Sequence, residues 1–245
     1  MKFLGIKSLI KSSIRTLGYD IRKAVVGQDP FYDMQQLTKS QRPVVIFDVG
    51  ANVGQTIDLF RKIITQPIIH AFEPSQQTFR ELQDKYSGIP DLYLNNCALG
   101  AQPGVQEFIE NTHPTMNSFL EPGVASWGAI KQRVQVDVKT VDDYCVDLGV
   151  DAIDILKLDT QGFDLKIIEG SIQLLAQHRI HLIYMEIIFS EMYKGLPRFD
   201  EIFGFLADRG FSLVTFYEFH YQNGRLGWTD ALFVDQKFQS LSSQM

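Results

Sequence analysis

The sequence predicts an α/β fold in which helices cover both faces of a mostly parallel, seven-stranded sheet. "VVIFDV" is an apolar run without polar alternation, which is typical of a strand buried on both faces. From Val44 onward, short apolar runs alternate with helical patterns, and this alternation favours parallel pairing. "NGRLG" separates the last two apolar runs and predicts a C-terminal antiparallel hairpin. We expect this hairpin to add one antiparallel strand at the edge of the sheet.

The same alternation places the individual elements. The expected strands are "VVIFDV", "IIHAFEP", "LYLNNCAL", "IDILKLDT", "HLIYMEI", "FSLVTFYE" and "TDALFVD". The expected helices cover residues 56–64, 75–86, 141–148, 163–177 and 199–209, with Ser75 as the N-cap of the second. The rhythm breaks over residues 101–140, which we interpret as an insert. The predicted organisation is an N-terminal helical extension, 1–42, followed by one domain, 43–245.

Composition and charge narrow the class of function. The chain has 245 residues, 45% of them hydrophobic, and a formal net charge of -6. An acidic chain is not expected to coat a polyanion, so we expect no nucleic-acid partner. Cys97 and Cys145 form neither a C-x-x-C motif nor a zinc-ligand set, and a reducing compartment such as the cytoplasm is expected.

The N-terminus differs from the rest of the chain. "MKFLGIKSLIKSSIRTLGYDIRK" carries six basic residues against one acidic residue, and its apolar residues recur at roughly helical spacing. Such a helix could contact an anionic membrane surface, pack on its own domain or pair with a second subunit, for instance in a homodimer. These alternatives stay open. No apolar run is long enough for a signal peptide or a membrane span.

A glycine-bearing loop follows the first strand in "VVIFDVGANVGQT". The dinucleotide fingerprint needs a middle glycine, where this loop has Asn52, and a phosphate-binding P-loop needs a lysine that is absent. Asp48 would repel phosphate and attract a cation. Glu73 follows Gly50 by 23 residues, close to the spacing at which an acid binds ribose hydroxyls. These features predict a cationic adenosine ligand without phosphates, and S-adenosylmethionine fits this description.

Polar residues also stand at or near the ends of five expected strands. They are Asp48, Glu73, Asn96, Asp159 and Glu186. The carboxyl ends of parallel strands meet at one edge of a sheet, where ligands bind near the switch in strand order. The sequence therefore predicts a single site at this edge.

Four motifs together resemble the FkbM-type methyltransferases: "FDVGANVGQT", "AFEPS", "NNCALG" and "ILKLDTQGFDLKIIEG". The resemblance covers roughly residues 44–187 and implies a Rossmann-like, S-adenosylmethionine-dependent enzyme. It also implies O-methylation of a hydroxyl, often on a sugar or glycan or another small biosynthetic molecule, with the insert, 101–140, shaping the acceptor site. By motif, Glu73 would bind the ribose and Asp159 would stand beside the methyl donor. The other cofactor residues implied are Asp48, Gly50, Asn52, Gly54, Thr56, Pro74, Asn96 and Ala98.

Proton removal from the acceptor hydroxyl has several candidate residues. Lys157 and Asp159 are two apart on one strand and share a face, so Lys157 either orients Asp159, serves as a base or forms a structural ion pair. Asp159 and Glu186 end neighbouring strands, and paired carboxylates suit Mg²⁺. This layout is similar to that of catechol-type O-methyltransferases, which implies a possible Mg²⁺ site. The metal-free alternative makes Glu186 or His113, in the insert, the base.

Two other classes of function stay open. A nicotinamide-dependent oxidoreductase would use the same fold, although Asn52 replaces the glycine that its pyrophosphate needs. A non-catalytic scaffold could keep the fold without turnover, although it has no need of charges at the strand ends. In the insert, Asn117, Ser118 and Trp127 are candidates for contact with a sugar ring.

Overall fold

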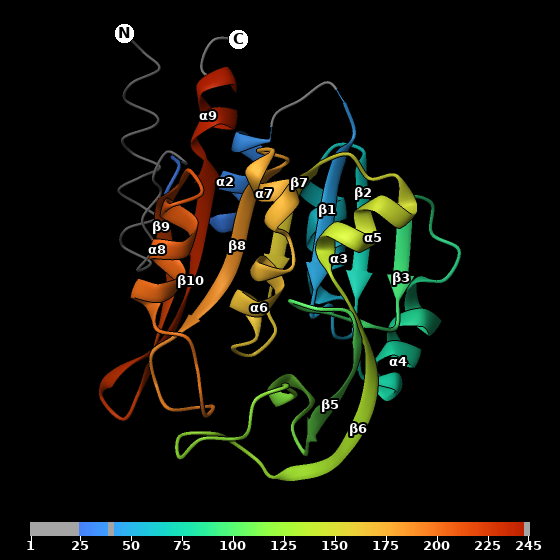
Figure 1. Ribbon diagram of the computed structural model, residues 1–245, viewed down its shortest axis with the longest axis vertical. Coiled ribbons are helices and arrows are strands. Elements are labelled where there is room, and N and C mark those ends of the chain that lie inside the picture. The colour runs from blue at the N-terminus through green and yellow to red at the C-terminus, as the bar shows by residue number, and fades with distance from the viewer. Residues whose placement is uncertain (1–24, 39–41, 243–245) are drawn as a thin grey trace, which may run out of the picture.

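In the computed structural model, which describes residues 25–38 and 42–242, the main sheet has the strand order β3-β2-β1-β7-β8-β10-β9 (Figure 1). The first five strands in this order are parallel, and β10 is antiparallel to both of its neighbours. This arrangement confirms the predicted sheet and its C-terminal antiparallel hairpin. The strand bounds are β1 Val44–Val49, β2 Pro67–Phe72, β3 Leu92–Asn95, β7 Ile153–Leu158, β8 Ile180–Ile188, β9 Phe211–Gln222 and β10 Arg225–Asp235.

The sequence led us to expect the antiparallel strand at the edge of the sheet, but the structure places it inside the sheet. β10 lies between β8 and β9, so β9 is the edge strand. The turn between them uses Asn223 and Gly224 with φ values of 52° and 74°, which a tight hairpin of right-handed twist requires. Ala231 to Val234 of β10 are fully buried, whereas much of the second half of β9 is exposed. The strand buried on both faces therefore takes the inner position.

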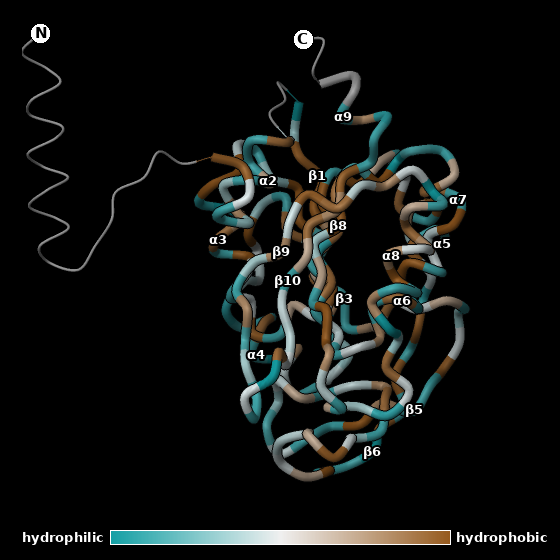
Figure 2. The backbone as a smooth tube through the Cα atoms, turned by 90° about the vertical axis from the view of Figure 1, so that its left-hand side faces the viewer, coloured by the Kyte–Doolittle hydropathy of each residue, from teal (hydrophilic) through white to brown (hydrophobic). Residues whose placement is uncertain are grey.

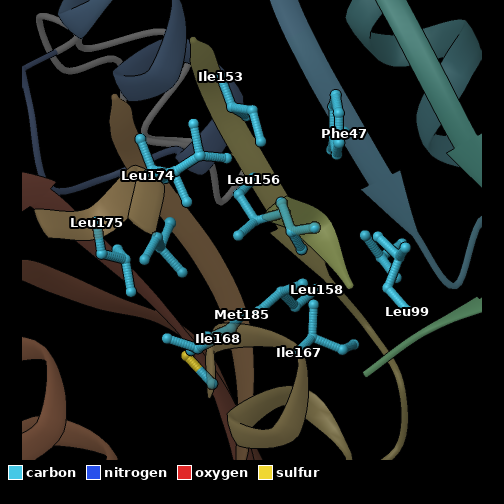
Figure 3. Packing of buried hydrophobic residues seen from close by; sticks show 14 of the residues in the cluster. Phe47, Leu99, Ile153, Leu156, Leu158, Ile167, Ile168, Leu174, Leu175 and Met185 are labelled. Carbon is cyan, nitrogen blue, oxygen red and sulfur yellow. The ribbon is translucent and has the colours of Figure 1, made fainter. Parts of the chain in front are cut away.

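Helices cover both faces of the sheet, and the edge-on view separates them into two layers (Figure 2). One layer holds α2 (Pro30–Leu37), α3 (Gln55–Ile63) and α4 (Gln76–Tyr86). The other holds α5 (Val141–Leu148), α6 (Asp164–Glu169), α7 (Ile172–Ala176) and α8 (Phe199–Ala207), and α9 (Gln236–Ser242) follows the last strand. Each layer packs its own apolar cluster against the sheet. Figure 3 shows the contact of β7 with α6 and α7 in one of them.

The helix predicted over 163–177 is instead two short helices, α6 and α7, which the sequence pattern did not separate. The chain breaks at Gly170, where a Cβ atom would lie 2.1 Å from the carbonyl oxygen of Gly100. The carboxylate of Asp142 then accepts the backbone N–H groups of Gln173 and Leu174 and caps the second helix. The apolar spacing alone gave no signal of this side-chain cap.

A second sheet lies beyond the carboxyl ends of the parallel strands (Figure 1). It consists of β4 (Ala98–Leu99), β6 (Ile130–Lys139) and β5 (Gly104–Asn111), in that order, and the short 3₁₀ helix η1 (Pro114–Met116) follows β5. The segment predicted as an insert, 101–140, supplies β5, η1 and β6. This segment therefore covers the edge at which the polar strand ends meet.

The predicted basic helix lies in residues 1–23, outside the described residues. The first helix in the described residues is α2, which lies within the predicted N-terminal extension, 1–42. Asp29 caps this helix by accepting the N–H of Tyr32, and Pro30 takes its first position. Among residues 25–38 and 42–242, no helix is long and apolar enough to span a membrane.

Candidate active site

A cavity of about 270 Å³ lies at the carboxyl ends of β1, β2 and β7. In the sheet, β2 lies on one side of β1 and β7 lies on the other. The strand order therefore switches direction at β1, and the cavity lies at this switch. Its walls come from the loops after these strands and from the insert. The lining residues include Gly50, Ala51, Asn52, Gln55, Thr56, Glu73, Pro74, Cys97, Ala98, Leu99, Phe108, Pro114, Thr115, Asn117, Phe119, Lys157, Asp159, Thr160, Gln161 and Phe163.

The glycine loop joins β1 to α3 and passes very close to β7. A Cβ atom at Gly50 would lie 2.0 Å from the carbonyl oxygen of Asp159, and Gly50 has a φ of +77°. Gly54, with a φ of +86°, lies against the ring of Tyr86, whose hydroxyl donates to the Gly54 carbonyl at 2.6 Å. Both positions need glycine because of φ and because of space. The loop thereby brings the N-terminus of α3 to the cavity wall.

Glu73 follows β2 and is buried beside this loop. Its carboxylate accepts the backbone N–H groups of Asn52 at 3.1 Å and Ser75 at 2.8 Å. Burial raises the pKa of Glu73 to about 7, although these two N–H donors act in the opposite direction. The Ser75 hydroxyl also donates to Glu110, a residue of the insert, at 2.6 Å. Ser75 therefore links the carboxylate of Glu73 to the insert. Glu73 is thus a fixed acceptor in the wall of the cavity.

The opposite end of the cavity is apolar and aromatic. Phe119 packs edge-on against Phe108, with ring centroids 4.9 Å apart. It also packs against Phe163, with ring centroids 4.5 Å apart and the ring planes tilted by 33°. Ala98 and Leu99 of β4 complete this wall. A cavity with an apolar aromatic wall at one end and a buried carboxylate at the other suits a purine nucleoside, with the base against the rings and the ribose at Glu73.

Lys157 and Asp48 form a buried ion pair beneath the glycine loop. The Nζ atom lies 2.9 Å from Oδ1 of Asp48, donates to the Gly50 carbonyl at 3.2 Å and lies 3.7 Å from Asp159. Burial by itself would lower the pKa of Lys157, but the two carboxylates outweigh it and raise the pKa above its usual value. A lysine held in the protonated state cannot accept a proton, so the geometry favours the orienting role over the base role.

A second group of acids lies beside the cavity at the ends of β7 and β8. The side-chain amide of Gln161 donates to Asp159 at 3.1 Å and to Glu186 at 3.4 Å. Burial first, and then the negative charge of Asp159, raise the pKa of Glu186 well above its usual value. Asp230 on β10 lies opposite Glu186 on β8 in the register of the two antiparallel strands. The carboxylate of Asp230 accepts a hydrogen bond from the Tyr184 hydroxyl at 2.6 Å. The strand ends thus bring the two predicted carboxylates together.

Comparison with known proteins decides the family. Residues 48–213 match the family model described as the methyltransferase FkbM domain. The chain belongs to the FkbM methyltransferase family. The 2-O-methyltransferase NoeI of Sinorhizobium fredii is 22% identical over 206 residues, which cover 78% of this chain and 82% of that protein.

Solved structures of low identity are similar to the chain. One of them is TrmK of M. capricolum in complex with S-adenosyl-homocysteine, which is 9% identical to this chain with a TM-score of 0.48. The matched region covers 86% of this chain and 70% of the TrmK chain. Another is an rRNA methylase from Streptococcus thermophilus, which is 12% identical with a TM-score of 0.46. The matched region covers 84% of this chain and 93% of the methylase chain.

The residues expected to hold the cofactor of this FkbM enzyme fall into two groups. Those that line the cavity are Gly50, Asn52, Thr56, Glu73, Pro74, Ala98 and Asp159. The other three lie behind the wall and fix it. Asp48 acts through Lys157, Gly54 accommodates Tyr86, and the Asn96 amide donates to the Glu73 carbonyl at 2.9 Å. The cavity offers a buried carboxylate, an apolar aromatic wall and a helix N-terminus, and these groups fit S-adenosylmethionine.

Of the four catalytic candidates, the structure brings three together. Lys157 and Asp159 line the cavity, and Glu186 reaches it through Gln161. His113 is exposed, stands at the N-terminal end of η1 and does not line the cavity.

The expected Mg²⁺ site does not fit the groups found between the two carboxylates. The Gln161 amide nitrogen lies within hydrogen-bond distance of both, so its N–H groups point to where a shared cation would bind. Within residues 25–38 and 42–242, no three His, Cys, Asp or Glu side chains gather in an arrangement that could hold a metal ion. No step of the reaction is therefore assigned to a metal at this position.

Several residues at or near the cavity were not singled out from the sequence. Gln161 follows Asp159 by two residues in "LDTQGF", and that spacing was the available signal. Phe119 and Phe163 read as ordinary apolar residues of the insert and of a helix. Tyr193, whose hydroxyl donates to the Gln161 side-chain carbonyl at 2.8 Å, lies in a loop with no recognisable pattern.

Proposed function

We propose that this protein transfers a methyl group from S-adenosylmethionine to a hydroxyl of a sugar, a glycan or another small biosynthetic molecule. The observation that carries the proposal is the pair of carboxylates, Asp159 and Glu186, beside the cofactor cavity. An alcohol needs a proton acceptor to act as a nucleophile, and these are suitable groups. The name of NoeI, a 2-O-methyltransferase, supports oxygen as the acceptor atom.

The bound cofactor would supply a methyl group on a sulfonium, so that an oxygen–carbon bond forms, the sulfur keeps the electrons of the broken bond and a base takes the hydroxyl proton. The chain supplies alignment and the base. Asp159 lines the cavity and its side chain is 49% exposed, so an acceptor can approach it from solvent. Glu186 lies next to it, held by the same Gln161 amide, and its raised pKa makes its ionised form a stronger base than an ordinary carboxylate.

The test is transfer of labelled methyl from S-adenosylmethionine to a panel of free sugars, oligosaccharides and polyketide-type alcohols. We expect label in at least one hydroxyl-bearing acceptor, and loss of that label with Asp159→Asn. Label found only in amines would contradict O-methylation. Calorimetry with S-adenosylhomocysteine and with NAD separates the oxidoreductase alternative, since only the first should bind.

We further propose that transfer needs no divalent metal, since an amide occupies the space between the carboxylates. Exhaustive treatment with EDTA should leave the rate unchanged. The Mg²⁺ alternative makes the opposite prediction, namely loss of activity in EDTA and recovery on adding Mg²⁺.

A further inference from the structure

Gln161 is the residue that connects the two acidic strand ends. Its side-chain nitrogen donates to Asp159 at 3.1 Å and to Glu186 at 3.4 Å, so both N–H groups of the amide are used. Its side-chain oxygen accepts the hydroxyl of Tyr193 at 2.8 Å. An amide turned the other way would aim its oxygen at the carboxylate of Asp159, which is repulsive, and only a protonated Glu186 could donate to that oxygen. The surroundings therefore fix the orientation of this amide.

Tyr193 is well placed to hold the amide. Its side chain is 3% exposed and packs with Met116, Ile188 and Met192 in a small apolar cluster. The hydroxyl is also 3.3 Å from the carbonyl of Met116, but the contact with Gln161 is the shorter of the two. Because the ring is buried, the hydroxyl has little freedom to leave this position.

The backbone of Gln161 is fixed as well. It has a φ of 55°, a left-handed conformation that is strained for a residue with a side chain. The Ser118 hydroxyl of the insert donates to its carbonyl at 2.9 Å. At Gly162, the next residue, a Cβ atom would lie 2.3 Å from Leu196 and 3.1 Å from Leu120. Contacts from the insert and from the loop after β8 thus maintain the strained turn.

We propose that Gln161, held by Tyr193, is a positioning residue that aligns the carboxylates of Asp159 and Glu186 toward the acceptor hydroxyl. This inference rests on the proposed function. Held by one amide, the two carboxylates lie side by side at the cavity without a cation between them. One of them takes the hydroxyl proton as the oxygen–carbon bond forms and the carbon–sulfur bond breaks, and water then removes that proton.

The charged groups around Glu186 explain why an amide is needed at this point. Asp159 just after β7, Asp164 on α6 and Asp230 on β10 all act on it as negative charges, and Lys157 is the opposing cation. Lys157 is already paired with Asp48 at 2.9 Å. A neutral double donor can order two of these acids without adding charge, which neither a third acid nor an apolar side chain at position 161 can do.

The first test needs no acceptor. In ¹H–¹⁵N NMR spectra of the complex with S-adenosylhomocysteine, the pair of signals from the Gln161 side-chain NH₂ group should have chemical shifts that differ from those of free glutamine. This pair of signals is assigned by its loss in Gln161→Met. In Tyr193→Phe this pair should move toward the free positions. Tyr144→Phe is the matched control, because its buried hydroxyl contacts His70 and Asn95 instead. An unmoved pair in Tyr193→Phe overturns the proposed role of Tyr193.

The second test uses an acceptor found in the labelling panel. Gln161→Met should lower kcat at least about tenfold with KM for S-adenosylmethionine within about twofold, because binding of the donor is kept and alignment of the base is lost. Its kcat–pH profile should have an acid limb shifted to higher pH, since two donors to the carboxylates are gone. Tyr193→Phe should lower kcat about fivefold, as expected for one hydrogen bond.

The outcomes separate the two proposals. If wild-type protein transfers no methyl to any hydroxyl, the proposed function falls, and the positioning role falls with it. If the wild type is active and Gln161→Met has an unchanged kcat and pH profile, the role of Gln161 alone is overturned. Gln161→Glu should not rescue the rate, because it replaces both donors with a third acid.

Discussion

The Nζ atom of Lys157 lies 2.9 Å from Oδ1 of Asp48, and the two side chains are 6% and 0% exposed. The pair joins the ends of β1 and β7, which are neighbours in the sheet, and the same Nζ atom supports the Gly50 carbonyl. This ion pair therefore links the glycine loop to the ends of two neighbouring strands beside the cavity.

Lys157→Met should destabilise the fold strongly. The change leaves the carboxylate of Asp48 buried without its partner, and breaking such a pair costs about 3–5 kcal/mol. Replacing both partners with Lys157→Met and Asp48→Leu should recover much of this loss, because an apolar pair of similar volume avoids the uncompensated charge. Urea unfolding of the two single variants and the double variant measures this. A single-variant loss below about 1 kcal/mol would contradict a buried ion pair.

Gly50→Ala should destabilise the protein more than Gly88→Ala. Both glycines have a φ of +77°, so the conformational strain of a side chain is the same. At Gly50 a Cβ atom would also lie 2.0 Å from the Asp159 carbonyl oxygen, whereas at Gly88 no atom lies within 4 Å. We expect a difference of at least about 1 kcal/mol in urea unfolding, together with weaker binding of S-adenosylhomocysteine by Gly50→Ala alone. Equal losses would show that the close approach to β7 is unimportant.

The sheet, and the clustering of polar strand ends at one edge of it, could be predicted because each depends on local patterns. Apolar runs without alternation mark the central strands, and the glycine loop and Glu73 both line the cavity at that edge, whereas their role in binding the cofactor stays a prediction. The position of β10 could not be predicted, since it depends on which of two similar strands is buried on both faces. The same applies to Tyr193, whose hydroxyl reaches Gln161 across 32 residues of sequence. Contacts between distant loops carry no periodic signal.

Phe119→Ala should weaken binding of S-adenosylhomocysteine about tenfold. Its ring packs on Phe108 and Phe163 at the apolar end of the cavity, and aromatic contacts of this kind contribute about 1 kcal/mol each. Phe203→Ala is the control, because that ring lies on α8, is 41% exposed and does not line the cavity. Calorimetry measures both affinities. If the two variants bind equally well, the base is not held at this wall.

Binding of S-adenosylhomocysteine should strengthen as the pH rises through about 7. Burial raises the pKa of Glu73 from an ordinary 4.5 to about 7 in the free protein, so the side chain is largely protonated below that value. Only the ionised form can accept both hydroxyl protons of a ribose, so the affinity should fall about tenfold per pH unit below 7 and level off above it. Binding near pH 7 should therefore release a proton.

The stability of the free protein should change with pH in the opposite sense. Between pH 4.5 and about 7 the folded protein binds a proton at Glu73 that the unfolded chain has lost, so the contribution of this group to stability declines as the pH rises through that window. S-adenosylhomocysteine should offset this decline.

Calorimetry in buffers of different ionisation enthalpy measures the proton release on binding. The variant Glu73→Gln cannot ionise at this position, so it should bind S-adenosylhomocysteine more weakly and without this pH dependence. A pH-dependent affinity that persists in Glu73→Gln would assign the proton to another group.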